Sequence, residues 1–284
     1  MEVALAYQRC EEITRAEARN FFYGIRLLPG PKRRAMSALY AMARRIDDVG
    51  DGPLPPDGKL ARLAELRTDI DALAGGGLSN PDDPVLVGLR HAIDRFPIPA
   101  AALNEIVTGC EQDAAGVTYS TIEDTEHYCR LVAGSVGRLS LGVFGSSGDP
   151  GEAAGLADVL GVALQLTNIL RDIVEDRNMG RVYLPAADIE RFGCAPDLIG
   201  PPAAVGALVA YEAERAERYF AEGLGLLDRL DHRSRACTGA MAGIYRRLLG
   251  RIAARPTAVL EGRLSVPTRQ KAWVAVRSLV GVPA

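Results

Sequence analysis

The sequence predicts an all-α fold in which a bundle of helices encloses one large core. Apolar residues recur at three- and four-residue spacing along most of the chain, whereas alternating strand patterns are nearly absent. Proline and glycine fall between the periodic segments, where helices would end. With 284 residues and 48% hydrophobic composition, the chain can bury a sizeable core. We therefore expect a single domain over residues 1–284.

The expected helices follow one another with short breaks. Seven segments have the helical period, namely 11–28, 32–49, 59–73, 100–117, 155–176, 205–230 and 235–254. Pro- and Gly-rich stretches separate them, and none of these stretches is long enough to be a domain linker. No period of about 20 to 50 residues repeats, which argues against a solenoid of stacked helix pairs.

Composition excludes several classes of function. The 33 basic and 36 acidic residues leave a net charge of −3, so no overall positive field exists to hold nucleic acid or an anionic membrane surface. Five scattered cysteines without a CxxC pair indicate reduced thiols, and three distant histidines do not form a zinc site. No apolar run approaches the roughly 20 residues of a membrane span. We expect a cytoplasmic protein without a transmembrane segment; transient peripheral contact with the inner face of the membrane and the oligomeric state stay open.

A polar row interrupts the apolar pattern of segment 155–176. Asn168, Asp172 and Asp176 lie four residues apart. Side chains at this spacing drift by only about 40° around a helix, so all three point from one face. Carboxylate and amide oxygens in such a row suit Mg²⁺. The alternative is a solvated acidic face, which is weaker here because leucines and isoleucines crowd the same stretch.

A second acidic cluster ends segment 32–49, where Asp47 and Asp51 again stand four residues apart. The helix dipole disfavours negative charge at a helix C-terminus, so Asp51 requires a compensating cation, which a metal would provide. Arginines accompany both clusters, with Arg44 beside this one and Arg171 beside the first. Carboxylates, divalent ions and guanidinium groups together make a clamp for diphosphate. The alternative is intramolecular pairing between the arginines and the aspartates.

Two longer stretches carry a family resemblance. Residues 128–137 read YCRLVAGSVG, and residues 160–185 begin with LG and end with RVYLP. Both resemble signatures of the squalene and phytoene synthase family. The match extends to positions near both ends of the chain, which are Phe21, Asp47, Asp51, Tyr245 and Arg263. The resemblance implies the all-helical isoprenoid synthase bundle around a central apolar cavity, with the two aspartate-rich helices facing each other at its mouth.

The resemblance also implies roles for individual residues. Five residues match family positions that bind Mg²⁺ and diphosphate, namely Asp47, Asp51, Asn168, Asp172 and Asp176. Six further residues match positions that hold or neutralise diphosphate, namely Arg44, Gln165, Arg171, Arg181, Tyr245 and Arg263. Phe21 matches a substrate-binding position, Tyr128 matches a cavity tyrosine near the reacting carbons, and Val132, Ala133 and Gly137 match a segment whose small side chains let a helix bend around the prenyl tail. For Tyr128 the alternative is a core tyrosine with a satisfied hydroxyl.

By resemblance, the protein is a Mg²⁺-dependent prenyltransferase. Residues 20–29 and 242–249 look most like bacterial presqualene diphosphate synthases of hopanoid pathways, so the leading hypothesis is condensation of two farnesyl diphosphates to presqualene diphosphate, with release of diphosphate. Ile25 stands where some C30-forming relatives carry a second phenylalanine. Phytoene synthesis from two geranylgeranyl diphosphates, a carotenoid reaction, is therefore the alternative.

Two further expectations concern the limits of this activity. An inactive helical protein that binds lipids or serves in assembly is the alternative from a different class, and the intact acidic clusters argue against it. We find no GxGxxG fingerprint and no apolar C-terminal anchor, so we expect the reaction to stop before any reduction by NADPH.

Overall fold

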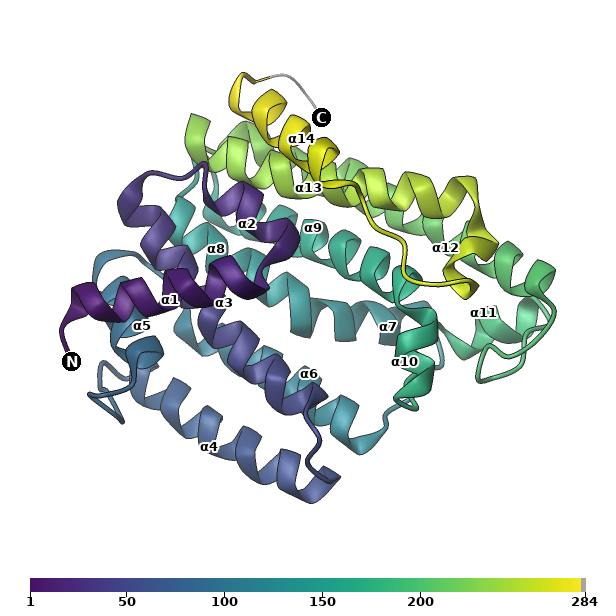
Figure 1. Cartoon of the computed structure of the whole chain (residues 1–284), viewed down its shortest axis with the longest axis horizontal. Coiled ribbons are helices and arrows are strands. Elements are labelled where there is room, and N and C mark those ends of the chain that lie inside the picture. The colour runs from purple at the N-terminus through teal and green to yellow at the C-terminus, as the bar shows by residue number, and fades with distance from the viewer. Residues whose placement is uncertain (282–284) are drawn as a thin grey trace.

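The computed structural model describes residues 1–281, all of whose regular elements are helical (Figure 1). The first seven α-helices are α1 (Val3–Glu17), α2 (Arg19–Ile25), α3 (Gly30–Asp51), α4 (Pro56–Ala74), α5 (Pro84–Arg95), α6 (Leu103–Ala115) and α7 (Ile122–Cys129). The others are α8 (Ser135–Phe144), α9 (Pro150–Arg171), α10 (Ile173–Asn178), α11 (Ala186–Arg191), α12 (Pro202–Gly223), α13 (His232–Ala254) and α14 (Thr268–Leu279). Short turns of other helix types are η1 (Ala100–Ala102), the π-helix η2 (Arg130–Gly134), η3 (Leu224–Arg229) and η4 (Pro256–Leu260).

Helix α9 lies near the middle of the bundle (Figure 1). It packs against α12, η2, α8 and α13, and the Asp149 carboxylate caps its start by accepting a hydrogen bond from the Glu152 N–H at 2.7 Å. By length and hydropathy alone α9 could span a membrane, which corrects the expectation that no apolar run is long enough. In the structure 67% of its apolar window is buried within the protein, as expected for a core helix.

Small residues let α9 approach its neighbours closely. A Cβ on Gly161 would overlap the Ala133 carbonyl oxygen in η2, and a Cβ on Gly137 would overlap the Ala157 carbonyl oxygen in α9. These contacts give Ala133 and Gly137 a packing role in addition to the expected one beside a prenyl tail. Glycine is required here because the backbones themselves are in contact.

Buried charge fixes the same junction. Asp158 of α9 is 5% exposed, and its carboxylate accepts hydrogen bonds from Arg130 in η2 and Arg138 in α8. A buried carboxylate is stable only when cations or hydrogen bonds compensate it. The α9 core therefore determines where η2 can lie.

Several expected helices are interrupted. Segment 11–28 breaks at Ala18, so that α2 leaves α1 at a new angle, and segment 205–230 continues only as a 3-10 turn after Gly223. Segment 155–176 breaks at Asp172, whose φ of −104° and ψ of 16° fall outside the helical range. The Asp172 N–H still bonds to the Asn168 carbonyl at 2.9 Å, and the Asp176 N–H bonds to the Asp172 carbonyl at 2.8 Å. The change of direction is therefore confined to this one junction.

We expect Gly161→Ala to lower the free energy of unfolding by about 1–3 kcal/mol, because the added methyl would force α9 away from η2. Gly155→Ala, in the same helix, is the matched control: no atom lies within 4 Å of its added Cβ. Alanine there should stabilise the protein by about 0.5–1 kcal/mol. Urea unfolding followed by circular dichroism measures both changes, and equal effects of the two substitutions would contradict this account of the packing.

Candidate active site

The two acidic clusters lie within electrostatic reach of each other. Asp47 and Asp51 occupy the last turns of α3, and Asp176 lies in α10. Burial, followed by the charge of Asp51, raises the pKa of Asp47 from 3.8 to about 7. Burial, followed by the charge of Asp172, raises the pKa of Asp176 from 3.8 to about 8, and Asp51 adds to this effect. The structure thus brings together the clusters that the sequence places on separate helices.

Asp47 combines solvent access with close surroundings. Its side chain is exposed, yet desolvation is the largest cause of its raised pKa. Both observations hold if Asp47 lines a recess that water enters but protein surrounds on most sides. A charged ligand bound there would lose much of its hydration, so fixed charges in the recess would act on it strongly.

Arg181 joins the two clusters. It follows α10 in the chain, and its guanidinium donates to the Asp51 carboxylate at 2.7 Å and to the Gly50 carbonyl at 2.8 Å. This cation lies at the C-terminus of α3, where the helix dipole favours positive charge. Arg181 thus supplies, from the protein itself, the compensation for Asp51 that the sequence analysis expected from a metal.

Asp172 is held by two arginines. The Arg171 Nε donates to Asp172 Oδ1 at 2.7 Å, and the Arg263 Nε lies 2.9 Å from the same oxygen. For Asp172, and for Asp51 with Arg181, the alternative of intramolecular ion pairing is what the structure contains. The expectation of one continuous helix through Asn168, Asp172 and Asp176 is wrong at Asp172, where the helix breaks. The role of these side chains as Mg²⁺ ligands stays a prediction.

Asn168 has an oxygen without a partner. Its Nδ2 donates to the Gln165 Oε1 at 3.2 Å, whereas its Oδ1 is buried and accepts no hydrogen bond. The Nε of Arg44 is likewise buried without a partner, although another nitrogen of that guanidinium lies 2.7 Å from Asp48. A buried unsatisfied oxygen beside crowded carboxylates fits a cation that would accept its lone pair.

The oxygen donors fit Mg²⁺ that is shared with a substrate. Among residues 1–281, no group of three or more His, Cys, Asp or Glu side chains is arranged to hold a metal ion. Mg²⁺ is usually bound by only one or two carboxylates, with waters and substrate phosphates completing the octahedron. Separated carboxylates on α3 and α10 match that requirement, whereas an all-protein cage would need closer convergence.

Asp113 is a site residue that sequence reasoning missed. It lies in α6, where it accepts hydrogen bonds from the Tyr128 hydroxyl at 3.0 Å and from the Tyr183 hydroxyl at 2.9 Å. Burial raises the pKa of Asp113, although the nearby Arg181 opposes this. Its charge contributes in turn to the raised pKa values of Asp47 and Asp176. A lone aspartate in an amphipathic helix gives no distinguishing signal in the sequence.

Three tyrosines form a stack beside Asp113. The Tyr128 and Tyr183 rings are 4.8 Å apart with an interplanar angle of 22°, and the Tyr119 ring lies 5.3 Å from Tyr128. Burial, followed by the charge of Asp113, raises the pKa of Tyr128 well above 10. Tyr128 is therefore both a buried tyrosine with a satisfied hydroxyl, as the alternative held, and a neighbour of the acidic clusters.

A second aromatic group surrounds Phe21 on α2. Its ring lies 5.9 Å from Tyr245 of α13 and 6.4 Å from Tyr40 of α3. Tyr245 also interacts with the guanidinium of Arg171. Phe21 and Tyr245 thus adjoin the Arg171 and Asp172 end of the site, although they are far from these residues in sequence.

The apolar residues of the proposed tail site lie on η2 and α8. Val132, Ala133 and Gly137 are only partly buried, as is Leu164 on the facing helix α9. Partly accessible apolar side chains between packed helices are what a cavity lining requires. The central apolar cavity itself stays a prediction.

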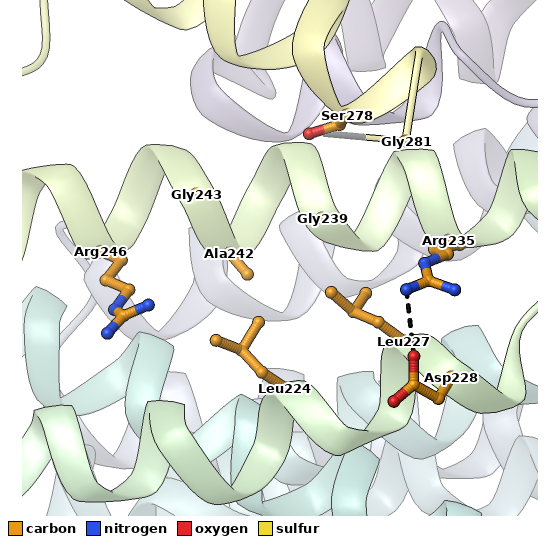
Figure 2. A pocket seen from close by; sticks show the side chains of 10 residues that line it. All are labelled: Leu224, Leu227, Asp228, Arg235, Gly239, Ala242, Gly243, Arg246, Ser278 and Gly281. Atoms are coloured by element: carbon orange, nitrogen blue, oxygen red, sulfur yellow. Dashed lines mark hydrogen bonds and ion pairs between the residues drawn. The ribbon is translucent and has the colours of Figure 1, made fainter. Parts of the chain in front are cut away.

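A surface hollow elsewhere has different chemistry. It lies between η3, α13 and α14, where Leu224, Leu227 and Ala242 line it (Figure 2). Its arginines are already paired, Arg235 with Asp228 and Arg246 with Glu217. None of the predicted site residues lines this hollow, so it is not the candidate active site.

Known proteins resemble the chain over almost its whole length. A family model described as squalene/phytoene synthase matches residues 14–270. Phytoene synthase of Mycobacterium bovis is 42% identical over 98% of this chain and 92% of its own length, and presqualene diphosphate synthase of Rhodopseudomonas palustris is 34% identical over 83% and 84%. The crystal structure of a dehydrosqualene synthase superposes with a TM-score of 0.88 and 30% identity, over 98% and 97%. The chain therefore belongs to the squalene/phytoene synthase family and has its all-α isoprenoid synthase fold.

Proposed function

We propose that this protein condenses two molecules of geranylgeranyl diphosphate head to head, as a phytoene synthase. The observation that carries this choice is the 42% identity to a mycobacterial phytoene synthase, against 34% for a presqualene diphosphate synthase. It favours the alternative of the sequence analysis over the leading hypothesis. Ile25, buried in α2 one helical turn after Phe21, agrees with it, because isoleucine is smaller than the phenylalanine of some C30-forming relatives.

Condensation of two farnesyl diphosphates to presqualene diphosphate is the second candidate. The presqualene diphosphate synthase of Rhodopseudomonas palustris still shares 34% identity over 83% of the chain. The two reactions differ by five carbons in each prenyl tail, so the same charged groups serve either substrate. The reactions also differ in outcome, because presqualene diphosphate keeps one of the two diphosphates whereas a C40 hydrocarbon has lost both.

The charged residues are suited to removing diphosphate from an allylic carbon. Asp47, Asp51, Asn168, Asp172 and Asp176 would hold Mg²⁺, which when bound neutralises charge on the departing diphosphate. Arg171 and Arg263 now each place two nitrogens on the Asp172 carboxylate, and Arg181 places one on Asp51. A bound diphosphate offers these guanidinium groups bidentate contacts with more charge. When substrate binds, the arginines would thus exchange their carboxylate partners for phosphate oxygens, and Mg²⁺ would pair with the carboxylates.

The tyrosine stack is suited to the carbocation that follows. Tyr128 keeps its proton at neutral pH, because its pKa is raised well above 10, so it donates a hydrogen bond and does not act as a base. The stacked faces of Tyr128, Tyr183 and Tyr119 offer negative π density to a cation without providing a nucleophile. Burial of these rings excludes water, which would otherwise quench the cation.

We expect Asp176→Asn to lower turnover at least about 100-fold, because it removes charge that the diphosphate clamp requires. Asp48→Asn is the matched control, since Asp48 is on α3 next to Asp47 but is 56% exposed and pairs with Arg44. It should lose less than about tenfold. Diphosphate release at saturating Mg²⁺ measures both, and unchanged turnover in Asp176→Asn would refute the clamp.

We expect the metal-free protein to lose stability as the pH rises from 6 to 9. Asp47 and Asp176 have folded-state pKa values of about 7 and about 8, above the ordinary 3.8, so the folded state binds more protons in this range than the unfolded state. Mg²⁺ at pH 8 should restore stability by binding the ionised carboxylates. Thermal unfolding checks this, and Asp176→Asn should reduce both the pH dependence and the effect of Mg²⁺; an unchanged pH profile in that variant would contradict it.

The product identifies the substrate. We expect purified protein with Mg²⁺ to consume geranylgeranyl diphosphate in preference to farnesyl diphosphate and to yield a C40 hydrocarbon by mass spectrometry. Accumulation of presqualene diphosphate from farnesyl diphosphate would instead support the second candidate. Absence of Mg²⁺-dependent diphosphate release from either substrate would support the inactive lipid-binding or assembly alternative.

A further inference from the structure

The outward face of α14 carries large apolar side chains in contact with solvent. Trp273 is 57% exposed, Val276 is 54% exposed and Val280, just after the helix, is 67% exposed. Trp273 is the only tryptophan in the sequence. Single exposed apolar residues are common on proteins, but three within eight residues form a patch that requires an explanation.

These side chains share one face of the helix with a cation. Arg269, Trp273, Val276 and Val280 are separated by four, three and four residues, which aligns them along one side. The opposite side, with the buried Val274 and Ala275, faces the protein. Helix α14 is therefore apolar on both sides, and only the inner one has a partner in the fold.

The segment that carries this face is basic in sequence. From residue 262 to residue 281 the chain contains four basic residues, Arg263, Arg269, Lys271 and Arg277, and no acidic residue. Arg263 pairs with Asp172 of the candidate active site and does not contribute to this face, Lys271 and Arg277 interact with other groups of the protein, and Arg269 is exposed. The chain as a whole carries a net charge of −3, so this local positive charge runs against the overall balance. Such a segment attracts an anionic surface.

We propose that the Trp273, Val276 and Val280 face of α14 docks onto the surface of an anionic lipid bilayer. Tryptophan prefers the headgroup region, because its ring is apolar and its N–H is polar. Basic side chains beside it gain energy from anionic headgroups. A second copy of this chain is the alternative occupant, which the oligomeric state of the variants below tests.

The position of α14 links docking to the candidate active site. Helix α14 packs on α13 and α2 at the outer edge of the bundle (Figure 1). Helix α2 carries Phe21, and α13 carries Tyr245, whose ring lies 5.9 Å from that of Phe21. A bilayer held at α14 would thus lie beside the helices of the site. Exchange of prenyl substrate and hydrocarbon product with that bilayer rests on the proposed function; docking itself does not.

Trp273 reports the docking directly. Tryptophan fluorescence of the wild-type protein should shift to shorter wavelength when phosphatidylglycerol-containing vesicles are added, because the indole leaves water. Neutral phosphatidylcholine vesicles should give a weaker shift, because the electrostatic attraction is lost. Salt at about 0.5 M should weaken the shift seen with the anionic vesicles, because it screens that attraction. An unchanged spectrum with anionic vesicles would overturn the proposal.

Two variants distinguish docking through this face from non-specific adsorption of the protein to vesicles. Val276→Glu should reduce co-sedimentation with phosphatidylglycerol vesicles about tenfold or more, because it places a carboxylate at the bilayer surface. Leu60→Glu is the matched control: Leu60 is 38% exposed on α4, at the opposite edge of the bundle (Figure 1), and its replacement should leave vesicle binding unchanged. Equal loss in both variants would overturn the proposal. So would a dimer in wild type that Val276→Glu converts to a monomer, since this would assign the face to a second copy.

Activity measurements distinguish failure of this inference from failure of the proposed function. With detergent-dispersed substrate, Val276→Glu should turn over at the wild-type rate, because Val276 is outside the candidate active site. With substrate supplied in anionic vesicles, its rate should fall in parallel with its vesicle binding. An enzyme that binds vesicles but releases no diphosphate would refute the proposed function alone. An active enzyme that ignores vesicles would refute docking alone.

Discussion

Mutual repulsion among carboxylates is the constraint on which the rest of this structure depends. Asp47 and Asp51 end one helix, Asp172 and Asp176 follow the break in another, and Asp113 lies near both groups. Burial makes each charge more costly and each neighbour adds to the cost, so Asp47 and Asp176 bind protons more readily than exposed aspartates. A fold that keeps such a site must stabilise it elsewhere.

Two features of the fold provide that stability. Arginines that come from other elements, Arg181 and Arg263, neutralise part of the charge. Around α9, close backbone packing at Gly161 and the buried Asp158 fix the positions of η2 and α8. The site is therefore held by a closely packed helical frame, and its charged groups are already paired with one another. Such charged groups suit a ligand with a highly charged head.

Much of the helical bundle could be predicted from the sequence, because amphipathic periodicity is local information. Segment 32–49 corresponds to α3 and segment 235–254 to α13 with small shifts at their ends. The breaks at Ala18 and Asp172 could not be predicted in this way, since neither position is a proline or glycine and the apolar period continues across both. The π-helix η2 could not be predicted either, because its close contact with α9 is not local information.

The candidate site was predictable where residues repeat at helical spacing. Asp47 with Asp51 and Asp172 with Asp176 stand out as pairs, and their juxtaposition follows from the fold. Asp113 did not stand out, because it has no distinctive neighbour in the sequence. Tyr183 lies in the RVYLP motif, but its hydrogen bond to Asp113 joins positions 70 residues apart, so its role there was not predicted. Arg181 and Arg263 were found only through the family resemblance. Their partners, Asp51 and Asp172, are visible only in three dimensions.

The long sequence separation of these ion pairs has a consequence for protein synthesis. Arg181 reaches back 130 residues to Asp51, and Arg263 reaches back 91 residues to Asp172. During translation the acidic end of α3 emerges long before either arginine, so the growing chain carries these carboxylates without their partners. Contacts between residues so far apart in sequence form late in folding, because closing a long loop costs conformational entropy. These two ion pairs are thus both completed only when nearly the whole chain has left the ribosome.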